Sequence, residues 1–548
     1  MTPKSNNGAP AKNAVLKTVL AIATGGAVLV SWRAFVDPAK GISPGIFSEA
    51  AKVELFRHPP APAVVVVPTK PGARVAVSDY FVDDSGAIDS FFAALHRLEL
   101  PAGDGAPQVV TVLHYGDSPT TADLITGDVR SMLQKRFGDG GHGFLLTAKP
   151  WAWYQHRGVD ISDRGWTAST AVGKMRDDTY GVGGASFEGT SGASSHITLR
   201  DSYQRTMEVA YLGRPGGGTV SVTANGAEVG TFSTAAESVG PAWHTVTLPE
   251  GTTSVDVKPV SGAVRLFGET FRTSGRGVVY DSLGLNGAST TVLSNGFNAT
   301  AWTAELQHER PALVIINYGT NESGFGSYVD KYYEPSLRTA IKRIKAALPG
   351  VPILVMSPMD RGLRSGVDEI HTYDTIPRIV AIQRRVAAEQ GCAFFDTFDA
   401  MGGDGTMARW YMGHPRLVSG DLIHPTPQGA AMVAQLLVKD LMTGYEQYLE
   451  RQHLERKHDV VVAGVQAVVP APAPVAKPSP KPSLAMVPSG KPKPSAMGEP
   501  LAPVAPPAAA PATPDAPKQE TPPVQTVPPV VTPGAPQPQQ QPPQRQPS

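Results

Sequence analysis

Four short groups of residues, in a fixed order along the chain, have side chains suited to nucleophilic catalysis. They are Gly116-Asp117-Ser118, Asn286-Gly287-Ala288, Gly319-Thr320-Asn321 and Asp421-Leu422-Ile423-His424-Pro425. A serine hydroxyl is a weak nucleophile until an imidazole takes its proton, and that imidazole needs a carboxylate to orient it. Ser118, His424 and Asp421 are therefore the candidate nucleophile, general base and orienting carboxylate.

The two middle groups supply candidate donors for the oxyanion that forms when a nucleophile attacks an acyl carbonyl. The candidates are the backbone N–H groups of Ser118 and Gly287 and the side chain of Asn321, with Gly284 as the competing glycine. Asn321 and Gly287 would alternatively be ordinary turn residues. Asp117 is expected to orient its loop or to cap the following helix.

These groups need a scaffold that brings them to one edge, and the surrounding sequence predicts one. Apolar runs without polar alternation, such as QVVTVLHYGDS, PALVIINYG, VPILVMS and CAFFDTF, are separated by helical patterns at about 121–137, 332–348 and 377–390 and after Thr426. This order predicts βαβ units around a buried parallel sheet. Ligands of such sheets bind at the carboxyl ends of the strands, where the four groups stand.

The sequence pattern changes between about residues 190 and 279. Short segments rich in Thr and Val alternate polar and apolar residues and are separated by glycine turns, as in HITLRD, GTVSVTANG and TSVDVKPVSG. That pattern is typical of an antiparallel β-sandwich. We therefore expect an α/β domain interrupted by an inserted β-sandwich.

The ordered motifs around Ser118, Gly287, Asn321 and His424, with Asp421 as the partner of the histidine, resemble those of the SGNH (GDSL) hydrolase family. The resemblance implies a flavodoxin-like three-layer α/β/α fold, no metal, and ester hydrolysis through an acyl-enzyme on Ser118.

A longer stretch, HYGDSPTTADLITGDVRSMLQKRFGDGGHGF, resembles the opening of exported peptidoglycan O-acetylesterases. Those relatives carry a carbohydrate-binding-like β-sandwich at the place of the insertion. Pro119 is a departure, because those relatives usually have histidine there and proline has no N–H to donate.

Composition excludes several other classes of protein. The chain has 548 residues, and its 48 Lys and Arg balance its 48 Asp and Glu, so no basic surface for nucleic acid is expected. A single cysteine, Cys392, rules out an intrachain disulfide and a cysteine-rich zinc site, and we expect it to pack in the core. No H-E-x-x-H motif, P-loop or dinucleotide-binding context is present, so neither a metal nor a cofactor is expected.

The two ends differ from the middle. An apolar stretch from Val15 to Val36 follows several lysines and is long enough for a membrane anchor, with a cleaved signal peptide as the rival interpretation. Either would export the chain, and we expect anchoring in the cell inner membrane with the catalytic domain in the periplasm or outside the cell. Half of the 52 prolines lie from Pro470 to Ser548, which predicts a disordered tail.

The sequence thus predicts six segments: a signal anchor or signal peptide (1–36), a Pro-rich juxtamembrane linker (37–77), the first part of the hydrolase domain (78–189), the β-sandwich (190–279), the second part of the hydrolase domain (280–457) and the disordered Pro-rich tail (458–548).

The function expected is that of an exported serine esterase that removes acyl groups, in particular O-acetyl groups, from a cell-wall or other extracytoplasmic glycan. An O-acyltransferase using the same site and a non-enzymatic wall-binding tether remain as alternatives. A cluster of ring side chains would either line a glycan groove or pack in the core: His142, Trp151, Trp153, Tyr154 and His156. Other substrate-binding residues and the oligomeric state stay open.

Overall fold

The computed structural model describes residues 80–101, 109–172, 178–366 and 369–454. The expected N-terminal anchor, the Pro-rich linker and the Pro-rich tail lie outside these residues. Across the described ranges, no helix combines the length and the apolar character that crossing a membrane requires.

A central sheet of six strands has five parallel strands in the order β14-β2-β15-β16-β19, and β1 pairs antiparallel with β19 at its edge. The strands are β1 (Phe81–Val82), β2 (Val109–Gly116), β14 (Gly277–Gly284), β15 (Leu313–Asn317), β16 (Ile353–Met356) and β19 (Ala393–Phe395). Numbered by their place in the chain, the parallel strands run 2-1-3-4-5, which is the flavodoxin-like order. Every residue of β2 after the first is buried, as expected for a strand covered on both faces.

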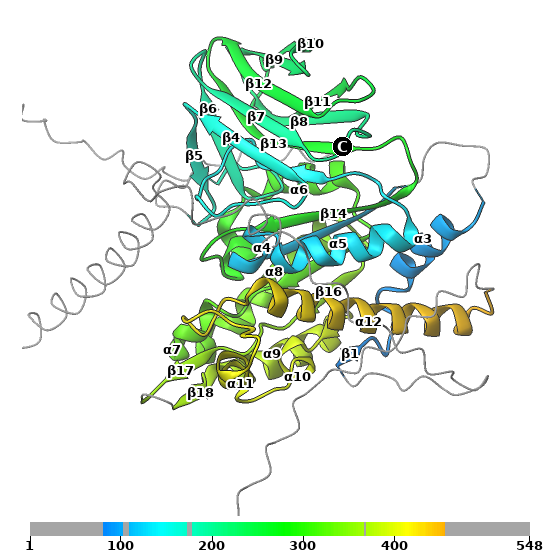
Figure 1. The fold of residues 1–548 in the computed structure, drawn as a ribbon, viewed down its shortest axis with the longest axis vertical. Helices are drawn as coiled ribbons and strands as arrows, with labels where there is room; N and C mark the ends of the chain where they lie inside the picture. The colour runs from blue at the N-terminus through cyan, green and yellow to red at the C-terminus, as the bar shows by residue number, and fades with distance from the viewer. Residues whose placement is uncertain (1–79, 102–108, 173–177, 367–368, 455–548) are drawn as a thin grey trace, which may run out of the picture. The chain divides into compact units, whose positions relative to one another are not determined.

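Helices cover both faces of this sheet and so form three layers (Figure 1). The helices of one face are α3 (Asp89–Glu99), α5 (Leu124–Phe137) and α12 (Pro427–Arg451), and those of the other are α6 (Ala299–Glu309), α8 (Glu334–Ala347) and α9 (Thr375–Glu389). Because side chains alternate along a strand, Val112 packs with the first set and Leu113 with the second.

Short elements cluster around the carboxyl ends of the strands. They are α4 (Ser118–Thr121), η3 (Val292–Gly296), η4 (Glu322–Gly324), α7 (Gly326–Tyr328), η5 (Val329–Tyr333), α10 (Thr397–Ala400), α11 (Thr406–Met412) and the hairpin of β17 (Gly362–Arg364) and β18 (Ile370–Thr372). The helix expected over about 121–137 is α5, which begins at Leu124, and α4 is a separate turn before it. The break falls at Asp123, whose φ of 49° is left-handed and cannot continue a helix.

The inserted region forms two further sheets, with strand orders β10-β9-β12-β7-β4 and β11-β8-β13-β6-β5. The strands are β4 (Val159–Arg164), β5 (Thr167–Thr170), β6 (Ala185–Gly189), β7 (Ser194–Leu199), β8 (Thr206–Gly213), β9 (Thr219–Ala224), β10 (Ala227–Ser233), β11 (Gly240–Thr247), β12 (Ser254–Ser261) and β13 (Val264–Arg272). All pairings between these strands are antiparallel.

These sheets begin at Val159, earlier than the expected boundary at residue 190. The reason is that β4 (VDISDR) alternates apolar and polar residues over only four positions before a polar end, and β5 (TAST) is short and mostly polar, whereas later strands such as β9 alternate along their whole length. The sheets end at Arg272, and β14, which starts at Gly277, already belongs to the central sheet. One more strand, β3 (Gly143–Leu145), pairs with β13 and connects the two regions.

Candidate active site

Ser118 lies at the carboxyl end of β2, where it is the first residue of α4. Strand β2 is the point at which the strand order reverses, because its two neighbours, β14 and β15, follow it in the chain. In open α/β sheets the crevice at such a point is the usual ligand site. The Ser118 side chain is half-buried, and its N–H has no acceptor within α4 because it stands at the helix start.

The three residues proposed for the proton relay meet in this crevice. Ser118 Oγ is 2.7 Å from His424 Nε2, and His424 Nδ1 is 2.6 Å from Asp421 Oδ2. With its Nδ1–H donated to the carboxylate, the imidazole presents the lone pair of Nε2 to the serine hydroxyl. This is the arrangement that lets a histidine act as a general base toward serine.

The loop of Asp421 is held by its own carboxylate. Asp421 Oδ1 accepts hydrogen bonds from the amides of Ile423, at 2.9 Å, and His424, at 3.0 Å, and from Ser419 Oγ at 2.7 Å. Burial alone would raise the pKa of Asp421, but these bonds and the one from the His424 ring lower it well below its usual value. The ionised carboxylate in turn raises the pKa of His424.

The proposed oxyanion donors reach the same edge through the sheet register. Gly116 pairs with Gly284 of β14 on one side and with Asn317 of β15 on the other. Gly287 and Asn321 follow those residues by a few positions, as Ser118 follows Gly116.

The two donor loops are also bonded to each other. Asn321 Nδ2 donates to the carbonyl of Ala288 at 2.7 Å, which leaves the second hydrogen of the amide for a ligand. Gly287 is exposed and has a φ of 73°, whereas a Cβ on Gly284 would lie 2.0 Å from the backbone nitrogen of Thr121. Gly284 is thus required for packing against α4, and this favours Gly287 as the donor.

Two buried carboxyl groups lie beneath these loops. Glu322 Oε1 accepts from the amide and the hydroxyl of Thr290, each at 2.8 Å, and Oε2 accepts from the amide of Gly319 at 3.1 Å. Burial raises the pKa of Glu322. Asp117 precedes α4 but makes no side-chain capping bond, and burial raises its pKa to about 7.

Arg361 is a further residue at the site that the sequence did not single out. Its Nη1 donates to the carbonyl of Thr320 and to Ser323 Oγ, each at 3.0 Å, and its guanidinium lies 4.3 Å from the ring centre of Tyr373. It therefore holds the segment on both sides of Asn321. Its positive charge also opposes the rise in the pKa of His424.

The ring side chains suggested for a glycan groove are divided. Tyr154 and His156 are buried, and Trp151 packs against the core. Trp153 is exposed, and His142 pairs with Asp201 at 2.5 Å. Tyr154, His156 and Trp151 therefore have the packing role that was the alternative to a groove.

Within the described ranges, no group of three or more His, Cys, Asp or Glu side chains is arranged to hold a metal ion. The expectation that no metal or cofactor is needed remains a prediction. Cys392 is buried and unpaired with any other cysteine, and its burial raises the pKa of the thiol to about 11.

Residues 249–432 match the family model of the GDSL-like lipase/acylhydrolase family. The matched range contains Gly287, Asn321, Asp421 and His424, whereas Ser118 precedes it on the other side of the β-sandwich. No curated protein matches the chain significantly.

Among solved structures, a peptidoglycan O-acetylesterase is 22% identical, with a TM-score of 0.56, and the match covers 68% of this chain and 99% of that one. The acetyl xylan esterase AlAXEase is 16% identical over 30% of this chain and 80% of its own, with a TM-score of 0.23. The salicylyl-acyltransferase SsfX3 from a tetracycline biosynthetic pathway is 12% identical over 53% and 98%, with a TM-score of 0.24. The first likeness is evidence for the fold alone, and the other two scores are too low to support an argument.

A flavodoxin-like sheet with serine, histidine and aspartate side chains at its switch point has the geometry that a serine-nucleophile hydrolase requires. Residues 249–432 thus match the GDSL-like lipase/acylhydrolase family, and the chain shares its fold with a peptidoglycan O-acetylesterase.

Proposed function

We propose that the protein is an exported serine esterase that removes O-acetyl groups from a cell-wall or other extracytoplasmic glycan. The observation that carries the proposal is the pair of short contacts from Ser118 Oγ to His424 Nε2 and from His424 Nδ1 to Asp421 Oδ2. The glycan is suggested by the inserted β-sandwich and by the fold shared with a peptidoglycan O-acetylesterase. Export is suggested by the apolar stretch from Val15 to Val36.

The reaction begins when Ser118 Oγ transfers its proton to His424 Nε2 and attacks the acetyl carbonyl carbon. The oxyanion that forms accepts hydrogen bonds from the N–H groups of Ser118 and Gly287 and from the Asn321 side chain. The bond from the carbonyl carbon to the sugar oxygen then breaks, and His424 returns the proton to the sugar hydroxyl. Asp421 stabilises the imidazolium throughout.

In the second half, a water molecule gives a proton to His424 and attacks the acetyl-enzyme. Collapse of the second tetrahedral intermediate releases acetate, and His424 returns the proton to Ser118 Oγ. The site is thereby restored without any change in the net number of protons on the enzyme residues.

The full-length protein should hydrolyse p-nitrophenyl acetate and release acetate from O-acetylated wall glycan. Ser118→Ala removes the nucleophile, so we expect kcat to fall by at least 10³-fold. Ser131→Ala is the matched control, because this exposed serine lies on α5 and bonds only within its own helix at the Gly127 carbonyl. Unchanged hydrolysis in Ser118→Ala would contradict the proposed mechanism. Transfer of the acetyl group to a sugar, in place of acetate release, would show that the protein acts as an acyltransferase.

A further inference from the structure

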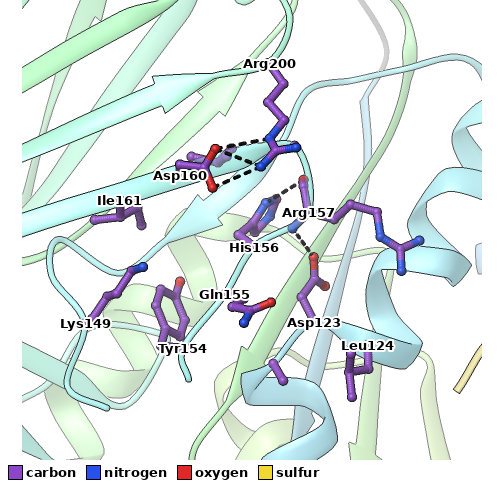
Figure 2. A pocket seen from close by; sticks show the side chains of 13 residues that line it. Asp123, Leu124, Lys149, Tyr154, Gln155, His156, Arg157, Asp160, Ile161 and Arg200 are labelled. Atoms are coloured by element: carbon purple, nitrogen blue, oxygen red, sulfur yellow. Dashed lines mark hydrogen bonds and ion pairs between the residues drawn. The ribbon is translucent and has the colours of Figure 1, made fainter. Parts of the chain in front are cut away.

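A cavity of about 360 Å³ lies next to the helix that carries the nucleophile, where the α/β part meets the β-sandwich (Figure 2). Its lining comes from the turn between α4 and α5, from the segment around residues 149–158, from β4, and from the end of β7. Ser118 is not among the residues that line it, so the cavity lies beside the nucleophile helix and does not contain the nucleophile.

The cavity is bonded directly to the nucleophile helix. Ala122, which lines it, donates its amide hydrogen to the Ser118 carbonyl at 3.1 Å. Gln155, which also lines the cavity, donates its backbone N–H to the Thr121 carbonyl at 3.2 Å. Because α4 has four residues, about 6 Å of helix lies between Ser118 and Ala122, the first residue that lines the cavity.

The acidic groups around the cavity are already neutralised by arginines. Asp123 is buried, forms an ion pair with Arg130 and accepts the backbone N–H of Arg157 at 2.7 Å. Asp160 binds the guanidinium of Arg200 through both carboxylate oxygens, at 3.0 to 3.2 Å.

The arginines on the wall are likewise occupied. Arg157 pairs with Asp128. Arg200 pairs with Asp160 (Figure 2). Both pairs are intramolecular, so neither guanidinium leaves a net positive charge in the cavity.

Lys149 is the exception among the charged groups of the wall. Its ammonium forms no ion pair with any described residue, and the nearby Asp163 accepts only its backbone amide, at 3.1 Å. The side chain is half-buried beside Tyr154 and Ile161, whose buried surfaces are largely apolar (Figure 2). An unpaired cation on such a wall favours an anionic ligand group, because a partly desolvated charge gains most from a partner of opposite sign.

We propose that this cavity binds a carboxylate-bearing sugar unit of the glycan. The Lys149 ammonium contacts the carboxylate, and the side-chain amide of the exposed Gln155 contacts hydroxyl groups of the sugar. The inference rests on the proposed esterase function, since the acetylated sugar would occupy the crevice at Ser118 while its neighbour in the same glycan occupies the cavity. Lys149 would then select glycans by charge without touching the reacting ester.

Binding can be measured separately from catalysis in the full-length Ser118→Ala protein. The probes are an alternating oligosaccharide of N-acetylglucosamine and N-acetylmuramic acid that is O-acetylated on its N-acetylglucosamine units and has its lactyl carboxyl groups free, and the methyl ester of the same oligosaccharide. Isothermal titration calorimetry should give a lower Kd for the free acid. Adding Lys149→Ala should raise the Kd of the free acid by roughly tenfold and leave the Kd of the methyl ester unchanged. Lys149→Arg, which keeps the positive charge, should restore most of the affinity for the free acid.

Lys342→Ala is the matched control, because Lys342 is an exposed lysine on α8, which does not line the cavity. Equal affinity for acid and ester, or an unchanged Kd in Lys149→Ala, would overturn the subsite. Hydrolysis of p-nitrophenyl acetate by Lys149→Ala in the otherwise wild-type protein should match wild type. If the wild-type protein fails to hydrolyse that ester, the proposed function fails while the binding comparison still decides the subsite.

Discussion

At the scale of single residues, the Asp421–His424 pair works while partly open to solvent. The side chains of His424 and Asp421 are 42% and 46% exposed, so water screens their mutual attraction. Geometry compensates for this screening, since Asp421 Oδ1 accepts hydrogen bonds from two amides and a hydroxyl while Oδ2 receives the imidazole. The carboxylate is thus held ionised and in a fixed place by its own loop.

Replacing Asp421 with Asn should change both the rate and its dependence on pH. His424 must be neutral to accept the serine proton, so kcat/KM rises as the pH passes the pKa of His424. Because Asp421 raises that pKa, Asp421→Asn should move the acid limb of the profile to lower pH. We expect kcat to fall on the order of 10²- to 10⁴-fold, measured with p-nitrophenyl acetate from pH 5 to 9.

Asp374→Asn serves as the comparison, since Asp374 is an exposed carboxylate that pairs with Arg378 at 3.3 Å. An acid limb that stays at the wild-type pH in Asp421→Asn would contradict the electrostatic role assigned to Asp421.

The candidate site was predictable to the extent that its chemistry depends on residue type and order. Ser118, Asp421 and His424 carry distinctive groups, and βαβ patterns place them at strand ends. Glu322 and Arg361 were not predictable, because their roles come from contacts distant in sequence. Glu322 binds Thr290, and Arg361 binds the Thr320 carbonyl. The only sequence signal for Glu322 is its position directly after Asn321, and the local sequence gives no signal for Arg361.

At the scale of elements, two loops must keep a common register for the oxyanion donors to converge. The loop after β14 carries Gly287 and the loop after β15 carries Asn321. Glu322 connects them, because one carboxylate oxygen binds Thr290 and the other binds Gly319. The bond from Asn321 to Ala288 adds a second connection.

Glu322→Ala should therefore affect stability and turnover together. It leaves the buried amides of Thr290 and Gly319 without their acceptors, at a cost of about 1–3 kcal/mol for each unsatisfied group. We expect a lower midpoint of thermal unfolding and, because Asn321 loses its support, a kcat lowered by at least about tenfold.

The matched variant is Glu334→Ala, on the surface of α8, where Glu334 pairs with Arg338 and Arg385. Exposed pairs of this kind contribute roughly 0–1 kcal/mol, so this variant should be nearly neutral. If the Glu322→Ala protein has the wild-type kcat at a temperature where the variant is folded, Glu322 does not position the oxyanion donors.

Sequence patterns predicted some of the strands and not others. The parallel strands were predictable because runs such as LVIIN are apolar throughout. The start of the β-sandwich was not, because β4 and β5 lie in the sheets through backbone pairing with β7 and β6, and their own side chains are mostly polar. Strand pairing that depends on a partner leaves little trace in the sequence of the strand itself.

At the scale of the whole described region, the β-sandwich and the α/β part share one hydrophobic core. A single cluster of buried side chains runs from Val222 and Phe187 in the sandwich to Trp302 and Ile341 beside the central sheet. Where the two parts meet, the rings of Trp243 and His308 stack with centres 3.9 Å apart, and His308 Nε2 lies 2.8 Å from Glu208 Oε1.

This junction also buries carboxyl groups, and they make the stability of the protein depend on pH. Glu269 of β13 is completely buried; its Oε1 accepts the Thr147 hydroxyl at 2.9 Å, and its Oε2 has no hydrogen-bond partner. Burial raises the pKa of Glu269 to about 8, from an unfolded value near 4.5. Between these pH values the folded state binds more protons than the unfolded state, so this group makes stability fall as the pH rises.

Glu269→Gln replaces the carboxyl group with a neutral amide that can still accept the Thr147 hydroxyl, so it should remove this contribution. We expect the free energy of unfolding to fall less between pH 5 and pH 8 in Glu269→Gln than in wild type, by more than about 1 kcal/mol, and the midpoint of thermal unfolding to fall less accordingly. Glu228→Gln, at an exposed position on β10 of the same sandwich, should keep the wild-type slope. Because other buried acids such as Glu305 titrate in both proteins, only the difference between the slopes is informative. Identical slopes would mean that the pKa of Glu269 is not raised in the folded state.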